Sequence, residues 1–190
     1  MAHFSIGLVH YPIYNKHGDI ITTALTNYDI HDLARSATTY GVENYYIIHP
    51  NFAQRKLAEE IMEHWQTGFG STYNPDRKDA FAHVKLRENL AQVREEIHRE
   101  TGHPPQIITT DARTYPNTVT YRQGREWLQT TDNSYLLLFG TGYGMTKEAM
   151  QSFDYILEPI YGAGAYNHLS VRSAAAIMLD RLCGTEWWQA

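Results

Sequence analysis

The sequence has a single cysteine, Cys183, among its 190 residues. One cysteine cannot form an internal disulfide or a zinc site built from cysteine pairs, and it fits a reducing compartment. No apolar run approaches the roughly 20 residues that a membrane-spanning helix needs. The N-terminus lacks a basic segment, and His10 and Pro12 interrupt its first apolar stretch, so a signal peptide is not expected. We therefore expect a cytoplasmic protein without a membrane anchor.

The sequence is also short of positive charge. Lys and Arg number 16 against 21 Asp and Glu, which gives a net charge of −5. This balance argues against a protein that coats nucleic acid through bulk positive charge, although a local basic patch is still compatible with it. Hydrophobic residues make up 43% of the chain, which is enough for a sizeable core. No linker or repeat divides the sequence, so we expect one domain over residues 1–190.

Short apolar runs alternate with helical patterns along the chain. The apolar runs predict strands at residues 4–9, 45–49, 81–86, 106–110, 135–139 and 154–157. Helical patterns lie at residues 29–40, 51–65, 88–101, 124–130 and 170–184. This alternation predicts an α/β fold with a mainly parallel sheet flanked by helices. Ligands of such folds bind outside the carboxyl ends of the strands.

Local signals predict where the first helices begin and end. Asp29 and Asn51 are the expected N-caps of the first two helices, and Gly41 is expected to end the first in a left-handed conformation. The second helix is expected to bury an apolar side made of Phe52, Leu57, Ile61, Met62 and Trp65. The segment 68–78 contains Gly, Ser, Asn and Pro, and we expect it to be a long loop.

Three glycines at alternate positions follow the most apolar strand, in the sequence FGTGYGM at residues 139–145. Glycine adopts backbone conformations that other residues avoid and lets a ligand approach the main chain. The turn therefore either binds a ligand or simply bends tightly. Its spacing matches neither the GxGxxG of dinucleotide sites nor the GxxxxGK[ST] of phosphate loops.

A second loop, at residues 157–170, leads into the last helix. Ser170 is the expected N-cap of that helix, and Ser173 lies near the same end. Free amides at a helix N-terminus can hold an anion or a carboxylate. Ordered loops of this length are usually functional; the alternative is a capped helix with an irregular entrance.

Three segments resemble the motifs of the SPOUT methyltransferases, which hold S-adenosylmethionine (SAM) in a C-terminal trefoil knot. Residues 29–42 are similar to the first motif of the SpoU-type branch, Asn-x5-Arg-x-Ala followed by Phe-Gly, with Asp29 in place of the asparagine. Residues 139–145 resemble the second motif, with Thr141 near the place of that branch's glutamate. Residues 166–177, YNHLSVRSAAAI, resemble the third. The likeness spans about residues 4–184 and is strongest to a bacterial group of short SPOUT proteins described as RNA methyltransferases.

This resemblance implies a knot over about residues 106–184 and a homodimer whose active site forms between the subunits. It implies a SAM-dependent methyltransferase that acts on RNA, either tRNA or rRNA. The residues expected to bind the cofactor lie in the two loops and at the end of the fourth strand: Thr110, Phe139, Gly140, Thr141, Gly142, Gly144, Leu157, Pro159, Ile160, Asn167, His168, Leu169, Ser170 and Ser173.

Three side chains are candidates for the chemistry of methyl transfer. Arg35 would organise the acceptor, because a guanidinium clamps phosphate or orients a nucleophile but does not accept a proton. Its alternative is a solvated helix residue in an ion pair with Asp29, Asp32 or Glu43. Asp29 is either the helix cap or an active-site carboxylate. His168 is either a proton acceptor or a loop residue that bonds main chain.

Arginines and tyrosines alternate between residues 113 and 125, which suits phosphate contact and base stacking. The RNA-binding candidates are Arg113, Arg122, Arg125 and Arg172; an ordinary polar loop is the alternative. The histidines show no ligand spacing, so no metal site is expected. Two other functions stay open: the same fold acting on a protein or small molecule, and a non-catalytic dimer that binds the cofactor or RNA.

Overall fold

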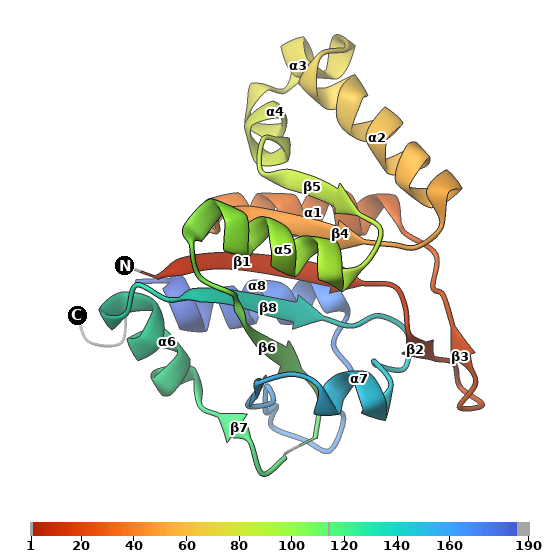
Figure 1. Ribbon diagram of the computed structural model, residues 1–190. Coiled ribbons are helices and arrows are strands. Elements are labelled where there is room, and N and C mark those ends of the chain that lie inside the picture. The colour runs from red at the N-terminus through yellow and green to blue at the C-terminus, as the bar shows by residue number, and fades with distance from the viewer. Residues whose placement is uncertain (1, 114, 186–190) are drawn as a thin grey trace.

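Seven parallel strands form the centre of the computed structural model, which describes residues 2–113 and 115–185 (Figure 1). Their order across the sheet is β5-β4-β1-β8-β6-β9-β7, and every pairing between neighbours is parallel. The strands are β1 (His3–Val9), β4 (Asn44–Ile48), β5 (Val84–Arg87), β6 (Gln106–Thr110), β7 (Thr118–Val119), β8 (Ser134–Phe139) and β9 (Tyr155–Leu157). The predicted α/β class with a mainly parallel sheet is confirmed.

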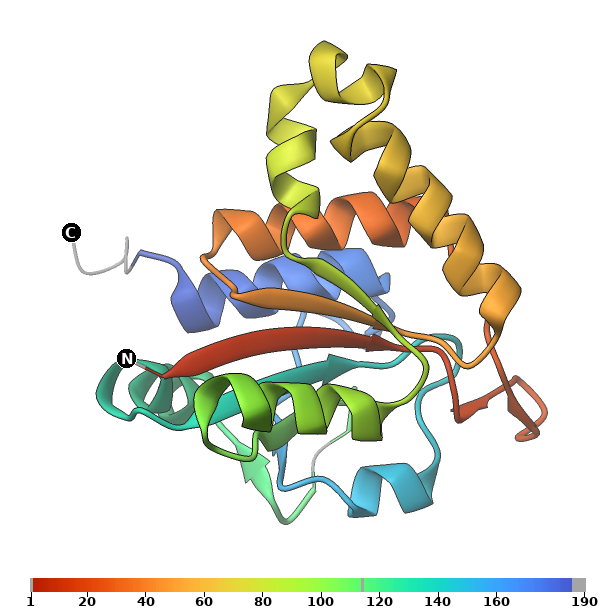
Figure 2. The ribbon, with the colours of Figure 1, turned by 45° about the horizontal axis from the view of Figure 1, so that its top comes forward.

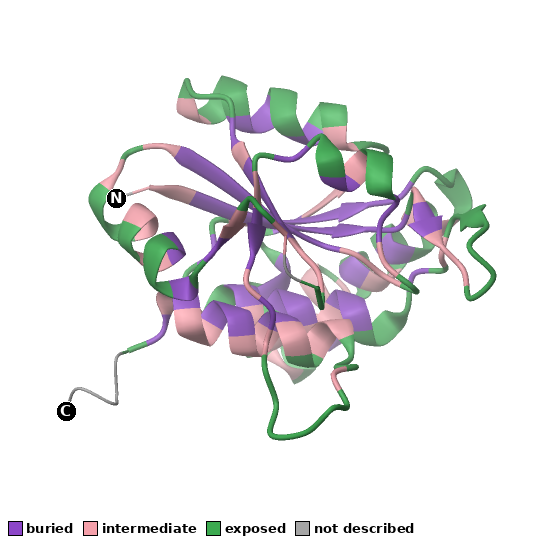
Figure 3. Ribbon diagram, turned by 90° about the horizontal axis from the view of Figure 1, so that it is seen from below, coloured by how far each residue is buried: buried purple, intermediate pink, exposed green. Residues whose placement is uncertain are grey.

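Helices cover both faces of the sheet, because successive side chains of a strand point to opposite faces. Leu137 of β8 packs into the core beneath α1 (Asn27–Thr39), α6 (Tyr121–Thr130) and α8 (Val171–Cys183). Leu136 and Leu138 pack into a second core beneath α5 (Leu90–Thr101) and α7 (Lys147–Gln151). Figure 2 shows orange α1 and blue α8 on one side of the sheet and green α5 on the other. In Figure 3 the strands are buried and the outer sides of the helices are exposed.

An arm of three helices follows β4 and projects beyond the β5 edge of the sheet (Figure 1). It consists of α2 (Phe52–Gln66), α3 (Phe69–Tyr73) and α4 (Pro75–Phe81). The expected loop at 68–78 is therefore wrong, because this segment folds into α3 and most of α4. The expected strand at 81–86 is shifted to Val84–Arg87, since Phe81 ends α4.

The apolar side expected for the second helix is only partly correct. Met62 is buried, and Ile61 and Trp65 pack against the core. Phe52 and Leu57 are 72% and 47% exposed. The arm stands away from the sheet, so α2 has only one narrow side to bury, and these two side chains lie outside it.

Helix ends follow the sequence signals with two differences. Thr26, not Asp29, is the N-cap of α1, and its hydroxyl accepts a hydrogen bond from the Asp29 backbone N–H. α6 begins at Tyr121 rather than at residue 124, because Thr120 and Gln123 form a capping box. Gly41 follows α1 with φ +69°, as expected.

A two-stranded hairpin, β2 (Ile13–Tyr14) and β3 (Ile20–Ile21), extends from the carboxyl end of β1. The sequence does not predict this hairpin.

Among the described helices, none is long and apolar enough to cross a membrane. The trefoil knot over about residues 106–184 stays a prediction.

Candidate functional site

Three neighbouring strands end at the segments that the sequence marks for cofactor binding. β8, β6 and β9 are adjacent and parallel. Thr110 is the last residue of β6, and Gly140 and Pro159 follow β8 and β9, so all three lie at one edge of the sheet. Thr110 is half-buried there, and its hydroxyl donates to the Leu138 carbonyl over 3.3 Å. The topology therefore brings together segments that are up to about 50 residues apart, at the edge where parallel sheets bind ligands.

The glycine turn after β8 is fastened to the β2 strand. The Tyr14 N–H donates to the Gly144 carbonyl over 2.9 Å, and the Tyr143 N–H donates to the Tyr14 carbonyl over 3.1 Å. Gly142 and Gly144 have φ values of +54° and +95°. A Cβ on Gly142 would come within 3.0 Å of the Ile13 side chain. The packing of the hairpin therefore requires glycine at position 142, whether or not the turn also binds a ligand.

Two buried histidines connect this turn to the strands beside it. His10 follows β1, His49 follows β4, and their ring centroids lie 4.9 Å apart. The Thr23 hydroxyl lies 3.0 Å from His10 Nδ1 and also bonds the Thr141 hydroxyl, which donates to the Val9 carbonyl. Thr141, near the place of a SpoU-type glutamate, is therefore turned toward β1 and Thr23.

Both rings are held neutral by their surroundings. Burial and the neighbouring His49 ring lower the pKa of His10 to about 4. Burial also lowers the pKa of His49. His49 Nδ1 accepts from the Asn51 N–H, so its Nε2 donates to the Thr23 carbonyl over 3.0 Å. These bonds fix the hairpin and the glycine turn relative to the sheet.

The loop between β9 and α8 exposes its main chain. Within the described residues, positions 162–169 form no backbone–backbone hydrogen bond. Ser170 is the N-cap of α8, as expected, and its hydroxyl accepts from the Ser173 N–H over 3.2 Å. His168 is exposed, with its ring edge against Tyr166 at 5.3 Å. The loop thus offers amides and carbonyls that a ligand could bond.

Residues of the first and third motifs line one hollow between α1 and α8, with a volume of about 450 Å³. Arg35 comes from α1, and Arg172 and Ser173 come from α8. Arg35 is exposed, and it forms no ion pair with any described carboxylate. Its expected alternative, an ion pair with Asp29, Asp32 or Glu43, is therefore not what the structure has.

Arg172 makes those ion pairs instead. Its guanidinium lies 3.8 Å from Asp29 and 3.4 Å from Asp32, and it covers the Tyr28 ring at 5.0 Å. Asp29 is buried inside α1, so the expectation that it caps the helix is wrong and its carboxylate faces the third motif. Arg172, expected to contact RNA, thus joins α8 to α1.

The other three RNA-binding candidates differ in their contacts. The Arg113 guanidinium donates two hydrogen bonds to Asp111, at 3.1 and 3.0 Å, and its side chain is 67% exposed. Arg125 donates to the carbonyls of Arg181 and Gly184, at the end of α8. Arg122 is exposed. Tyr121, which belongs to the alternation of arginines and tyrosines, is buried.

In the described part of the chain, no cluster of three or more His, Cys, Asp or Glu could hold a metal ion.

His10 and His49 were not expected at the site. Each is the first residue after a buried strand, and β1 and β4 are parallel neighbours. Their carboxyl ends must therefore lie together. The sequence signal that could have indicated them is a titratable side chain directly after each of two apolar strands.

Comparison with known proteins matches nearly the whole described chain to one family. A family model described as SAM-dependent RNA methyltransferase matches residues 3–184. An uncharacterized protein of Aquifex aeolicus is 48% identical over 177 residues, which cover 93% of this chain and 86% of that protein. A tRNA (guanine-N(1)-)-methyltransferase of Nitratidesulfovibrio vulgaris is 42% identical over 177 residues, and the match covers 93% of this chain but only 41% of that protein.

The fold is shared with a solved SPOUT-type enzyme. The SpoU methyltransferase AviRb from Streptomyces viridochromogenes, solved in complex with the cofactor AdoMet, superimposes with a TM-score of 0.59 and 16% identity. The match covers 95% of this chain and 60% of AviRb. The resemblance drawn from the three motifs is thereby confirmed.

Proposed function

Because the chain belongs to the SAM-dependent RNA methyltransferases, we propose that it transfers the SAM methyl group to a nucleotide of tRNA. The tRNA methyltransferase from Nitratidesulfovibrio vulgaris supports tRNA over rRNA. One observation carries the proposal: Arg35 of the first motif and Arg172 and Ser173 of the third line one hollow, at the end of α8 that the exposed loop enters. The reaction takes place in the cytoplasm, where tRNA is.

The residues at the carboxyl edge fit the cofactor. Exposed main chain at 162–169 and the ends of β6, β8 and β9 can bond an adenine ring and an amino-acid moiety. Gly162 and Gly164 add no side chain to this loop, and each has open space where a Cβ would stand, apart from the Tyr166 carbonyl at 3.9 Å from Gly162. When bound, SAM supplies a methyl group already activated on a sulfonium. The segment 106–184, folded as a trefoil knot in the single domain 1–190, would hold it.

The protein must then position the acceptor and remove one proton. Arg35 orients the acceptor or clamps its phosphate, because its charge is not neutralised by a described carboxylate. Asp29 and His168 are the two candidates for the proton. Asp29 is buried beside Arg172, whereas His168 stands exposed in the loop. The variants Asp29→Asn and His168→Gln separate the two candidates. Only substitution of the residue that accepts the proton should lower the rate of methyl transfer without changing SAM affinity.

The active unit is a homodimer with the site between its subunits. Tyr161, Tyr166 and Leu169 of the loop are 67%, 80% and 47% exposed in the single chain. Such a group of exposed apolar side chains beside a site supports cover by a second chain. Sedimentation equilibrium should give twice the mass of the chain, 21.9 kDa; a monomer at all concentrations contradicts the dimer.

The first test is SAM binding by calorimetry, with a thermal shift beside it. At a hundred times its dissociation constant, a ligand stabilises the folded state by about 2.7 kcal/mol. We expect one site per chain, with S-adenosylhomocysteine as a competitor. No heat and no shift at millimolar SAM contradict the proposed site.

The second test is transfer of a tritiated methyl group into separate tRNA, rRNA, protein and small-molecule fractions of a cell extract. Label in tRNA is expected. Label only in protein or small molecules supports the same fold with another substrate. SAM binding without label in any fraction supports a non-catalytic cofactor-binding dimer.

A further inference from the structure

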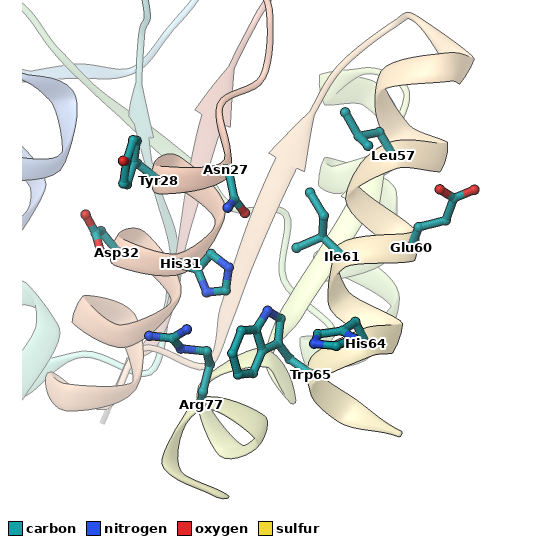
Figure 4. Close-up of a pocket in the computed structure, with 10 residues that line it drawn as sticks. All are labelled: Asn27, Tyr28, His31, Asp32, Leu57, Glu60, Ile61, His64, Trp65 and Arg77. Atoms are coloured by element: carbon teal, nitrogen blue, oxygen red, sulfur yellow. The ribbon is translucent and has the colours of Figure 1, made fainter. Parts of the chain in front are cut away.

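A cavity of about 520 Å³ opens between α1 and α2, on the side of α1 that faces the arm (Figure 4). Its walls are side chains of α1 and α2, and Arg77 of α4 lies at its lower end. Neither the glycine turn at 139–145 nor the loop at 157–170 reaches it, and its only motif residues are His31 and Asp32 of the first motif. It therefore needs an explanation separate from the cofactor site.

Planar groups gather in this cavity. The Arg77 guanidinium lies over the Trp65 ring, 4.3 Å from its centroid. The His31 ring stands edge-on to Trp65, with centroids 5.6 Å apart and planes at 88°. Aromatic rings and guanidinium planes are the surfaces on which proteins stack unpaired nucleobases.

Two polar atoms beside the cavity lack partners. In the part of the chain that the structure describes, His31 Nδ1 and Arg77 Nε are buried and form no hydrogen bond. A buried polar group without a partner costs free energy, so native proteins satisfy nearly all of them. Both atoms lie beneath the cavity surface, so a bound molecule would satisfy them only if the His31 and Arg77 side chains turn toward it.

The rim of the cavity favours a base rather than a phosphate. Asp32 and Glu60 both line it. Asp32 is already paired with Arg172, so the Glu60 carboxylate is the one that repels phosphate and accepts hydrogen bonds from the amino groups of bases. Tyr28, which is 68% exposed, and Leu57, which is 47% exposed, add apolar surface at the entrance. This combination of stacking planes, acceptors and apolar edges matches a nucleobase.

The cavity adjoins the proposed acceptor site. Asp32 lines both the cavity and the hollow that contains Arg35. His31 and Arg35 are four residues apart on α1, which makes them neighbours on the helix surface. A base held against His31 would therefore stand about one helical turn from the residue that orients the acceptor.

We propose that the α1–α2–α4 cavity binds an unstacked base of the RNA substrate, adjacent to the nucleotide that is methylated. This inference rests on the proposed function, because it takes RNA as the substrate. The cavity then contributes to which RNA is chosen. Stacking accounts for most of its affinity, and the Glu60 carboxylate favours bases that carry an amino group.

The test compares Tyr28→Leu and Trp65→Leu with the matched control Phe69→Ala. Phe69 is an aromatic residue of the same arm, 78% exposed and outside the cavity. The Kd for unmodified tRNA is measured by filter binding, and SAM affinity and far-ultraviolet circular dichroism verify the fold. Loss of one stacked base weakens binding by about tenfold or more. We expect this loss in both cavity variants, with unchanged SAM affinity, and none in the control.

A second readout identifies the contact directly. Ultraviolet crosslinking of wild-type protein to tRNA should attach a nucleotide to the tryptic peptide that contains Trp65. If wild-type protein binds and methylates tRNA but the cavity variants bind it equally well, the cavity inference is overturned and the proposed function stands. If wild-type protein binds SAM but no RNA, both fail. If Tyr28→Leu instead changes the mass of the particle in sedimentation, the cavity belongs to a protein interface and the inference is wrong.

Discussion

Arg35 and Arg172 face the same hollow but differ in their surroundings. Two carboxylates, at 3.4 and 3.8 Å, neutralise the charge of Arg172. No described carboxylate lies within ion-pair distance of Arg35. A guanidinium without a carboxylate partner is the one that can bind an incoming anion. The structure therefore shows a difference between the two arginines that the sequence does not: only Arg172 has carboxylate partners among the described residues.

Arg35→Ala should abolish methyl transfer while SAM affinity stays unchanged. Loss of one positioned donor to a reacting group lowers a rate by about a hundredfold or more. Initial rates with tritiated SAM, together with calorimetry, measure the two quantities. Arg94→Ala, an exposed arginine of α5 on the other face of the sheet, is the control. Loss of SAM binding in Arg35→Ala would mean that the assigned role is wrong.

His10 should make the protein less stable in mild acid. Its pKa is about 4 in the folded protein and about 6.5 when unfolded. The unfolded chain therefore binds the proton first, and stability is lost as the pH falls from about 6.5 to about 4. The loss amounts to roughly 3 kcal/mol. Urea unfolding at pH 7.5, 5.5 and 4.5 measures it.

His10→Gln should flatten this pH dependence, whereas His103→Gln, at an exposed position, should not. Because His10→Gln removes a fully buried ring, nuclear magnetic resonance of labelled histidines in the wild-type chain provides a second measurement. One ring should stay neutral down to about pH 4. If every ring titrates near pH 6.5, the prediction is wrong.

At the residue scale, the sequence motifs indicate residues that the structure brings together, but they do not indicate which of these residues form ion pairs. The motif pattern singled out Arg35, Arg172 and Ser173, and the structure brings them into one hollow. It did not indicate that Arg172 would pair with Asp29, because ion pairs between distant segments depend on how helices pack. The sequence does contain a signal for the true N-cap of α1, Thr26. Leu25 before it and Ile30 four residues after it have the spacing of a hydrophobic staple, and both are buried.

Among the elements, α4 depends on a single capping residue. The Asn74 side chain accepts from the Arg77 N–H over 3.1 Å, and Pro75 occupies the first turn. Asn74→Ala should lower the free energy of unfolding by about 1 kcal/mol, and Asn74→Asp, which keeps the acceptor, should change it little. Urea titrations of the three proteins check this. Equal stability of the Ala and Asp variants would show that the cap contributes nothing.

The arm also shows why segment 68–78 was misassigned. Its Gly, Ser, Asn and Pro are residues of loops, but Asn followed by Pro is equally a helix start. α3 and α4 are short, with 5 and 7 residues, so neither displays a full apolar period. Their helical state depends on packing against α2, as in the contact of Arg77 with Trp65, which sequence periodicity cannot reveal.

The whole molecule carries a net charge of −5, so RNA must be held by a local group of cations. The Kd for tRNA should rise steeply with salt, with a slope of about 0.7 to 0.9 per neutralised phosphate in a plot of log Kd against log salt. Arg122→Ala should lower that slope by about one if Arg122 contacts phosphate, whereas Tyr28→Leu should weaken binding without changing it. Filter binding from low to moderate salt measures both. A flat response contradicts phosphate contact.

At the scale of the fold, alternating apolar runs and helices were sufficient to predict the class, because a parallel sheet covered on both faces produces that pattern. The same pattern does not predict the order of the strands in the sheet. β8, late in the chain, lies between β1 and β6, and nothing local specifies such a neighbour. The short β2, β3 and β7 have two residues each, too few for a periodic signal.

The described part of the chain begins and ends near α6, at the end of the sheet opposite the loops at 139–145 and 157–170 (Figure 1). The Ala2 N–H donates to the Leu128 carbonyl, and Arg125 donates to the Gly184 carbonyl. A biotin tag or fluorophore attached at Ala2 or Thr185 would therefore lie away from these two loops. Molecules tethered to a sensor chip through such a tag would all present the same working edge to solution, which makes the chain suited to immobilised capture of its RNA.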